Sequence, residues 1–199
     1  MIDDYLRRRA AEPVDRLGRW LSARGVTATA LTAAGFLVGV AGCIALTQEA
    51  YGIALGCLVL NRIADLLDGA VARASSVTDF GGFTDIVADF LVYSGYVLAF
   101  AIGRPEEALS AAVLIYTFLG TGATFLAAAN IAAKRGIRRE PESRKSFFYN
   151  TALAEGAETT LYLVLICILP DHFAIISYVF AAVCWLSVIG HLRWARQFA

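Results

Sequence analysis

Long apolar runs dominate the pattern of hydrophobic and polar positions along this chain. Each run approaches the roughly 20 residues that a helix needs to cross a hydrocarbon core of about 30 Å. Six such windows lie near residues 28–48, 51–73, 80–103, 107–133, 147–169 and 172–193. Turn or charge signals separate them, in the stretches TQEAY, ASSVTD, GRPEE, KRGIRREPESRK and PDHF. The pattern therefore predicts an all-α integral membrane protein with six transmembrane helices.

The segment before the first window has a different pattern. Apolar residues recur there at helical spacing among arginines, at Leu6, Val14, Leu17 and Leu21. Since Trp20 and arginine are typical of membrane interfaces, we predict an amphipathic helix along the membrane surface, with a frayed polar tail as the alternative. The chain then divides into a juxtamembrane helix at 1–26 and a six-helix membrane domain at 27–199. We expect neither a secretory nor a twin-arginine signal, because the start is polar and mixed in charge.

Composition agrees with a membrane location, and the basic residues give an orientation. The 199 residues are 58% hydrophobic and 17% charged, which is too apolar for an ordinary soluble domain. Basic residues gather in 1–26, in the connection 134–146 and at the C-terminus, whereas the opposite connections offer only Arg104. The positive-inside rule then predicts that both termini and the ASSVTD connection are cytoplasmic.

Four aspartates interrupt the second and third apolar windows, in the stretch DLLDGAVARASSVTDFGGFTDIVAD. Charged side chains at membrane depth are costly, so each is a functional-site hypothesis. Asp65 and Asp68 are three residues apart on one helix, and Asp85 and Asp89 are four apart on the next, so each pair shares a face. The short connection predicts antiparallel neighbours, which brings all four carboxylates into one pocket at the cytoplasmic edge.

Four unpaired carboxylates in one pocket would repel one another and take up protons. Mg²⁺, Mn²⁺ or Ca²⁺ would remove the repulsion, and the lack of a suitable His or Cys argues against zinc. Two such ions could clamp a phosphoryl group while an aspartate at the open end takes a proton from an attacking hydroxyl. Gly69 and Gly81 suit close approach of a substrate to the backbone, and Arg73 can hold a phosphate oxygen. The alternative is that the carboxylates pair with Arg62, Arg73 and their neighbours.

The order D-x-x-D-G-x-x-A-R, then G-x-x-x-D-x-x-x-D, resembles the signature of the CDP-alcohol phosphotransferases, or class-I CDP-alcohol phosphatidyltransferases. Its eight fixed positions are present as Asp65, Asp68, Gly69, Ala72, Arg73, Gly81, Asp85 and Asp89. The resemblance covers most of the chain. It implies a homodimer in the inner membrane of a prokaryote, with membrane lipids and no nucleic acid as partners. It also implies transfer of a phosphatidyl group from a CDP-linked donor to an alcohol, with release of CMP, in phospholipid biosynthesis.

The resemblance further implies roles for individual residues. Two divalent cations, Mg²⁺ or Mn²⁺, would be bound, one by Asp65, Asp68 and Asp85 and the other by Asp65, Asp85 and Asp89. Asp89 would also be the catalytic base that activates the acceptor hydroxyl. The CDP moiety would contact Gly69, Ala72 and Arg73, with Gly81 and Thr32 close by. Many relatives read T-P-N-x-x-T where this chain reads TATALT, so Thr32 is kept and the Asn is missing.

The sequence does not identify the acceptor alcohol. The candidates are glycerol 3-phosphate, serine, an inositol phosphate or another lipid. Phe90 stands where many phosphatidylglycerophosphate synthases have Lys. Glu155 and Glu158 are candidate acceptor-binding residues, with an internal ion pair to Arg62 or to loop arginines as the equal alternative. Lys134 and Arg139 could bind a phosphorylated acceptor, although basic residues there also follow from the positive-inside rule alone.

Other functions share parts of this pattern. CDP-diacylglycerol is the expected donor, and the alternative within the family is a soluble CDP-alcohol used with a lipid hydroxyl. Aromatic prenyltransferases also carry intramembrane DxxD motifs, but they place two of them far apart in a longer bundle. A carboxylate-based membrane transporter should show an internal repeat or broken helices, and the sequence shows neither.

Overall fold

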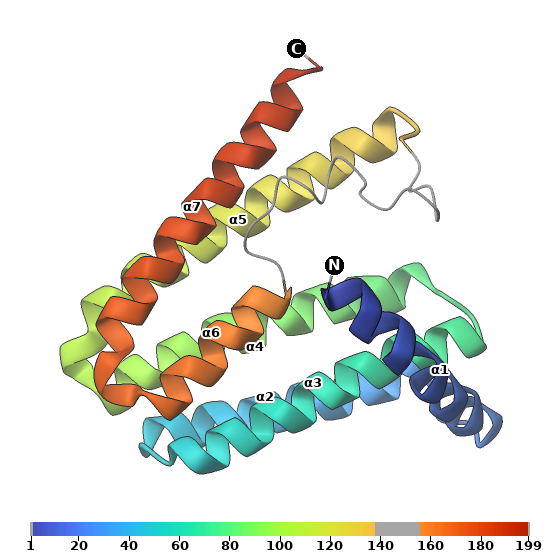
Figure 1. The fold of residues 1–199 in the computed structure, drawn as a ribbon, viewed down its shortest axis with the longest axis horizontal. Helices are drawn as coiled ribbons and strands as arrows, with labels where there is room; N and C mark the ends of the chain where they lie inside the picture. The colour runs from blue at the N-terminus through green and yellow to red at the C-terminus, as the bar shows by residue number, and fades with distance from the viewer. Residues whose placement is uncertain (1, 138–155, 199) are drawn as a thin grey trace. The chain divides into compact units, whose positions relative to one another are not determined.

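The structure is a computed structural model that describes residues 2–137 and 156–198 (Figure 1). All regular structure in those ranges is helical, as the sequence pattern predicts. The elements, in chain order, are α1 (Ile2–Ala23), α2 (Ala28–Thr47), α3 (Tyr51–Ala74), α4 (Asp79–Gly103), η1 (Pro105–Glu107), α5 (Ala108–Lys134), α6 (Gly156–Ile168), η3 (Pro170–His172) and α7 (Phe173–Arg196). They form two compact units, Met1–Gly95 and Tyr96–Ala199, and the boundary falls within α4.

Four segments of the described chain are long and apolar enough to cross a membrane: Ala28–Thr47, Asp79–Gly103, Pro105–Lys134 and Pro170–Arg196. Helix α3 has 24 residues, which is sufficient length, but its second half carries charged residues and is much less apolar. Helix α6 has 13 residues and begins where the described chain resumes after residue 155. The all-helical fold is thus confirmed, whereas the six-span count and the interfacial position of α1 stay predictions.

Local signals place the helix ends in the first unit. Gly25, two residues after the end of α1, adopts a φ of 81°, the left-handed conformation that glycine accepts without strain. Thr27 is extended, and its hydroxyl accepts a hydrogen bond from the N–H of Ala30 at 3.2 Å, which begins α2. Thr78 accepts the N–H of Gly81 at 3.0 Å in the same way and begins α4. These turns fix which faces of the helices meet.

Small residues allow the helices of the first unit to approach closely. Helices α2 and α3 run side by side in Figure 1, and a Cβ added at Gly35 would lie 2.9 Å from the Cβ of Ala64. Helix α1 packs on α3 still more closely, since a Cβ at Gly18 would lie 2.7 Å from the carbonyl carbon of Ala70. These contacts hold α1 and α2 against the half of α3 that carries the motif.

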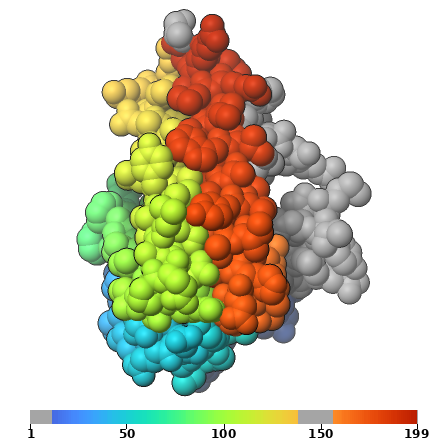
Figure 2. Space-filling view, turned by 90° about the vertical axis from the view of Figure 1, so that its left-hand side faces the viewer, coloured from blue at the N-terminus to red at the C-terminus, as the bar shows by residue number. Residues whose placement is uncertain are grey.

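The second unit is held together mainly by aromatic and aliphatic contacts along α7. Helices α5 and α7 lie against each other over much of their length (Figure 2), with the rings of Phe118 and Phe180 edge to face at 6.1 Å. The Phe180 ring also stacks on Tyr162 of α6 at 4.8 Å. The Tyr162 hydroxyl is 2.8 Å from the Ser177 hydroxyl, so this buried polar group is satisfied.

We predict that Gly18→Ala displaces α1 from α3. The new methyl group would lie 2.7 Å from the carbonyl carbon and from the Cβ of Ala70, and overpacking of this kind typically costs about 1–3 kcal/mol. Trypsin cleavage of the detergent-solubilised protein at the exposed Arg16 and Arg19 should then become on the order of tenfold faster, because cleavage needs local opening of the helix.

Gly52→Ala is the matched control for this substitution. A Cβ at Gly52 would meet no heavy atom within 4 Å, so it should leave the cleavage rate in α1 unchanged. Equal rates for the two variants would show that α1 does not depend on close contact with α3.

Candidate functional site

Three of the four motif aspartates converge in the first unit. Asp65 and Asp68 of α3 and Asp85 of α4 each offer a carboxylate oxygen, and these oxygens all lie within 4.8 Å of one another. An octahedral Mg²⁺ with ligands at about 2.0–2.1 Å places opposite oxygens roughly 4.2 Å apart. The three carboxylates therefore fit one hard divalent cation after small side-chain adjustments. Asp68 is buried and the other two are half-buried, so water competes with such an ion only in part.

A neighbouring helix orients one of these carboxylates. The Thr32 hydroxyl on α2 donates a hydrogen bond of 2.6 Å to Oδ2 of Asp68. Such partners fix the direction of a ligand side chain and are typical of metal sites. The resemblance gave Thr32 a role toward CDP. In the structure its hydroxyl donates to Asp68, and a contact between Thr32 and CDP stays a prediction.

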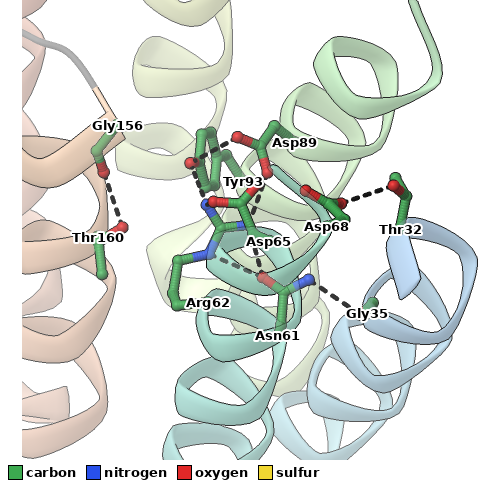
Figure 3. A network of polar contacts seen from close by, with 10 residues as sticks. All are labelled: Thr32, Gly35, Asn61, Arg62, Asp65, Asp68, Asp89, Tyr93, Gly156 and Thr160. Carbon is green, nitrogen blue, oxygen red and sulfur yellow. Dashed lines mark hydrogen bonds and ion pairs between the residues drawn. The ribbon is translucent and has the colours of Figure 1, made fainter. Parts of the chain in front are cut away.

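Asp89 is engaged differently from the other three aspartates, and Figure 3 shows its contacts beside Asp65 and Asp68. Its Oδ1 accepts a hydrogen bond of 2.6 Å from Nη2 of Arg62, and its Oδ2 accepts one of 3.0 Å from the Tyr93 hydroxyl. The same guanidinium lies 3.6 Å from Oδ2 of Asp65. The pairing with Arg62 that the sequence left as an alternative is thus present for Asp89 and, at longer range, for Asp65.

The Arg62 side chain is fixed in place by its surroundings. Oδ1 of Asn61 accepts hydrogen bonds from Nε and Nη2 of Arg62 at 2.9 and 2.6 Å. The Asn61 amide donates in turn to the carbonyl oxygen of Gly35 at 2.9 Å, which anchors it to the backbone of α2. Only 17% of the Arg62 side chain is exposed. The guanidinium is therefore held in the pocket wall.

An apolar groove adjoins the acidic pocket. The pocket is lined by Thr32, Gly35, Phe36, Asn61, Arg62, Asp65, Asp68, Asp85, Ala88 and Asp89. The groove is lined by Thr29, Thr32, Ala33, Phe36, Phe80, Phe83, Thr84, Val87, Ala88 and Leu91, from α2 and α4. Three residues belong to both, so the acidic pocket and the apolar groove share part of their walls.

The remaining motif residues lie at the ends of α3 and α4. Gly69, Ala72 and Arg73 occupy the last two turns of α3, and Gly81 lies in the first turn of α4. Arg73 is more than half exposed, and its Nη2 is 2.8 Å from Oδ1 of Asp15 on α1. The motif arginine thus pairs with α1 and not with the motif aspartates.

The candidate acceptor residues belong to the second unit or to undescribed segments. Glu158 is exposed in the first turn of α6, and Lys134 is exposed in the last turn of α5. Glu155 and Arg139 lie outside the described residues. Their roles toward an acceptor stay predictions.

Sequence reasoning missed three residues of the site. Asn61 is four residues before Asp65, and Tyr93 is four residues after Asp89, so helical phase alone could have placed both beside the motif. Asp15 carried no such signal, because its contact with Arg73 depends on how α1 packs against α3.

Comparison with known proteins places this site in a family. A family model described as CDP-alcohol phosphatidyltransferase matches residues 25–192. The chain belongs to the CDP-alcohol phosphatidyltransferase family. This confirms the family that the motif indicated, and with it a membrane-bound transferase of the class that acts on CDP-alcohols.

Two relatives are similar to this chain. Inner membrane protein YnjF of Escherichia coli is 41% identical over 188 residues, which cover 94% of this chain and 91% of that protein. The archaetidylinositol phosphate synthase of Pyrococcus horikoshii is 32% identical over 99 residues, which cover 49% of this chain and 53% of that enzyme.

We predict that Thr32→Val weakens binding of Mn²⁺ to the protein about 10–100-fold, the usual effect of removing a hydrogen-bond partner of a ligand. The substitution keeps the shape of the side chain but removes the 2.6 Å bond to Asp68. Mn²⁺ titration followed by electron paramagnetic resonance measures the affinity. Thr29→Val is the control, since Thr29 lines only the apolar groove. Unchanged Mn²⁺ affinity in Thr32→Val would contradict the assignment of Asp68 as a ligand that Thr32 orients.

Proposed function

We propose that this protein transfers the phosphatidyl group of CDP-diacylglycerol to an alcohol, with release of CMP, in a reaction that depends on divalent cations. One observation carries the proposal: Asp65, Asp68 and Asp85 of the family motif converge within 4.8 Å, in a pocket next to an apolar groove. Family membership supplies the reaction class.

In the proposed reaction an alcohol oxygen attacks the phosphorus that carries the lipid, and the bond from that phosphorus to the CMP oxygen breaks. Asp65, Asp68 and Asp85 would hold one Mg²⁺ or Mn²⁺, and Asp65, Asp85 and Asp89 a second. Bound cations supply charge neutralisation at the diphosphate and at the leaving group. Asp89 takes the hydroxyl proton, and Arg73 with Gly69, Ala72 and Gly81 contacts the CDP moiety.

The apolar groove supports a lipid-linked donor over a soluble CDP-alcohol. It begins at Thr32, Phe36 and Ala88, which also line the acidic pocket, and continues along apolar side chains of α2 and α4. A diphosphate at the aspartates would place the attached acyl chains in or beside this groove. Within a membrane the groove offers these chains van der Waals contact with α2 and α4 in place of contact with other lipid chains.

A phosphorylated alcohol is the first acceptor class to test. The relative from Pyrococcus horikoshii is an archaetidylinositol phosphate synthase, and the connection after α5 in this chain is rich in basic residues. Lys134 and Arg139 would bind the phosphate, and Glu155 and Glu158 the hydroxyls.

The proposed setting is the inner membrane of a prokaryote, with the enzyme as a homodimer. The active site and both termini would face the cytoplasm. The basic segments on one predicted side support this orientation, and the similar Escherichia coli protein is named as an inner membrane protein.

The test of the proposal is CMP release from CDP-diacylglycerol in detergent, with Mg²⁺ or Mn²⁺ and a panel of alcohols. The wild type should release CMP with at least one alcohol, and Asp89→Asn should lower the rate by about 10²–10⁴ because the base is lost. Binding of Mn²⁺ to the other three aspartates should persist in this variant.

Three outcomes would change the proposal. Absence of CMP release with every alcohol rejects the lipid-linked donor. Release only from a soluble CDP-alcohol in the presence of a lipid hydroxyl supports the alternative direction of transfer. Loss of CDP-diacylglycerol binding together with turnover in Asp89→Asn would make Asp89 chiefly a metal ligand.

The groove gives a separate prediction. Ala33→Trp should fill it and lower turnover of CDP-diacylglycerol at least about tenfold, while leaving the affinity for free CDP unchanged, because CDP has no acyl chain to displace. Ala34→Trp is the matched control, since Ala34 is also exposed on α2 but does not line the groove. Equal loss in both variants, or equal weakening of CDP binding, would contradict a role of the groove in holding the lipid.

A further inference from the structure

We infer that the guanidinium of Arg62 is a built-in cation on the Asp89 side of the acidic pocket. The free enzyme then binds one divalent cation, and a second enters only together with the diphosphate of the substrate. The inference rests on the proposed function, because it concerns the same carboxylates. It assigns to Arg62 a positioning role that neither the motif nor the family match contains.

The four aspartates of the motif differ in how the protein engages them. Asp65, Asp68 and Asp85 present oxygens within 4.8 Å of one another. Both oxygens of Asp89 are instead engaged, one by Arg62 at 2.6 Å and the other by Tyr93 at 3.0 Å. The ligands of one cation site, Asp65, Asp68 and Asp85, are therefore already together. Asp89, the ligand that belongs only to the second site, is instead bound to the positive side chain of Arg62.

Contacts on two sides hold the Arg62 side chain in position. Asn61 accepts two of its N–H groups and is itself only 5% exposed. The guanidinium carbon also lies 5.0 Å from the centre of the Tyr93 ring, within range of a cation–π contact. An arginine braced from α2 through Asn61 and from α4 through Tyr93 does not leave the pocket freely when a metal ion approaches.

The net charge of the pocket limits how many cations it accepts without substrate. Four carboxylates, one guanidinium and one dication leave a single negative charge, which is close to balance. A second dication without substrate would make the pocket positive and would bind Asp89 within a few ångströms of the guanidinium, where like charges repel strongly. The diphosphate of a CDP-linked substrate brings at least two negative charges and removes this obstacle.

The consequence is an order of binding. With Asp89 engaged by a second ion, the guanidinium of Arg62 would exchange this carboxylate for a phosphate oxygen of the substrate, for which its planar fork is well suited. Both divalent-cation sites are then filled only when a diphosphate is present.

The experiment counts Mn²⁺ ions bound to the detergent-solubilised full chain by electron paramagnetic resonance, with and without CDP. The wild type should bind about one ion per chain alone and about two with CDP. Arg62→Gln should bind about two without CDP, with the second ion bound at least about tenfold more tightly than in the wild type. Arg62→Lys should restore the one-ion state by keeping the charge. Tyr93→Phe removes one hydrogen bond from Asp89 and one from Arg62 without altering charge. Because the guanidinium and its contacts with Asn61 remain, this control should bind the same number of ions as the wild type.

Two results would overturn the inference: two ions of similar affinity in the wild type without CDP, or a single ion in Arg62→Gln without CDP. Absence of Mn²⁺ binding to the wild type with and without CDP would instead overturn the metal site of the proposed function. If Arg62→Gln fails to fold, the wild-type counts with and without CDP still decide, since equal counts contradict the order of binding.

Discussion

The organisation of the first unit follows from one constraint: clustered carboxylates in an apolar helical protein must be compensated by nearby positive charge or by hydrogen-bond donors. Asp68 is satisfied by Thr32, and Asp89 by Arg62 and Tyr93. The remaining charge at Asp65 and Asp85 is what a divalent cation would neutralise. The site is thus balanced in part by the protein and completed by what binds to it.

The compensating groups come from different helices, so packing and charge depend on each other. Arg62 is braced by Asn61, and Asn61 by the backbone of α2 at Gly35, where small side chains let α2 and α3 approach. A change in helix packing would therefore move the guanidinium that holds Asp89. Gly18 of α1 and Gly35 of α2 thus affect the site indirectly, because they set the distances from these helices to α3.

The juxtaposition of an acidic pocket and an apolar groove matches the chemistry of a substrate with two unlike ends. Phe36 and Ala88 belong to both surfaces, so the transition from charged to apolar lining occurs within about one helical turn. A CDP-linked lipid has the same abrupt transition at its diphosphate. The proposal of a lipid-linked donor rests on this geometry and not on the hydrophobicity of the chain.

The sequence by itself determined the helical fold, the pairing of the motif aspartates on two helix faces, and the family. These follow from local rules: apolar run length, helical periodicity and fixed spacing between charged residues. Tertiary structure alone decided that Arg62 pairs with Asp89, that Arg73 pairs with Asp15, and that Thr32 supports Asp68. Each of these contacts joins residues at least 27 positions apart. Spacing within one helix cannot specify such contacts, because they depend on the distance and rotation between helices, which side-chain packing sets.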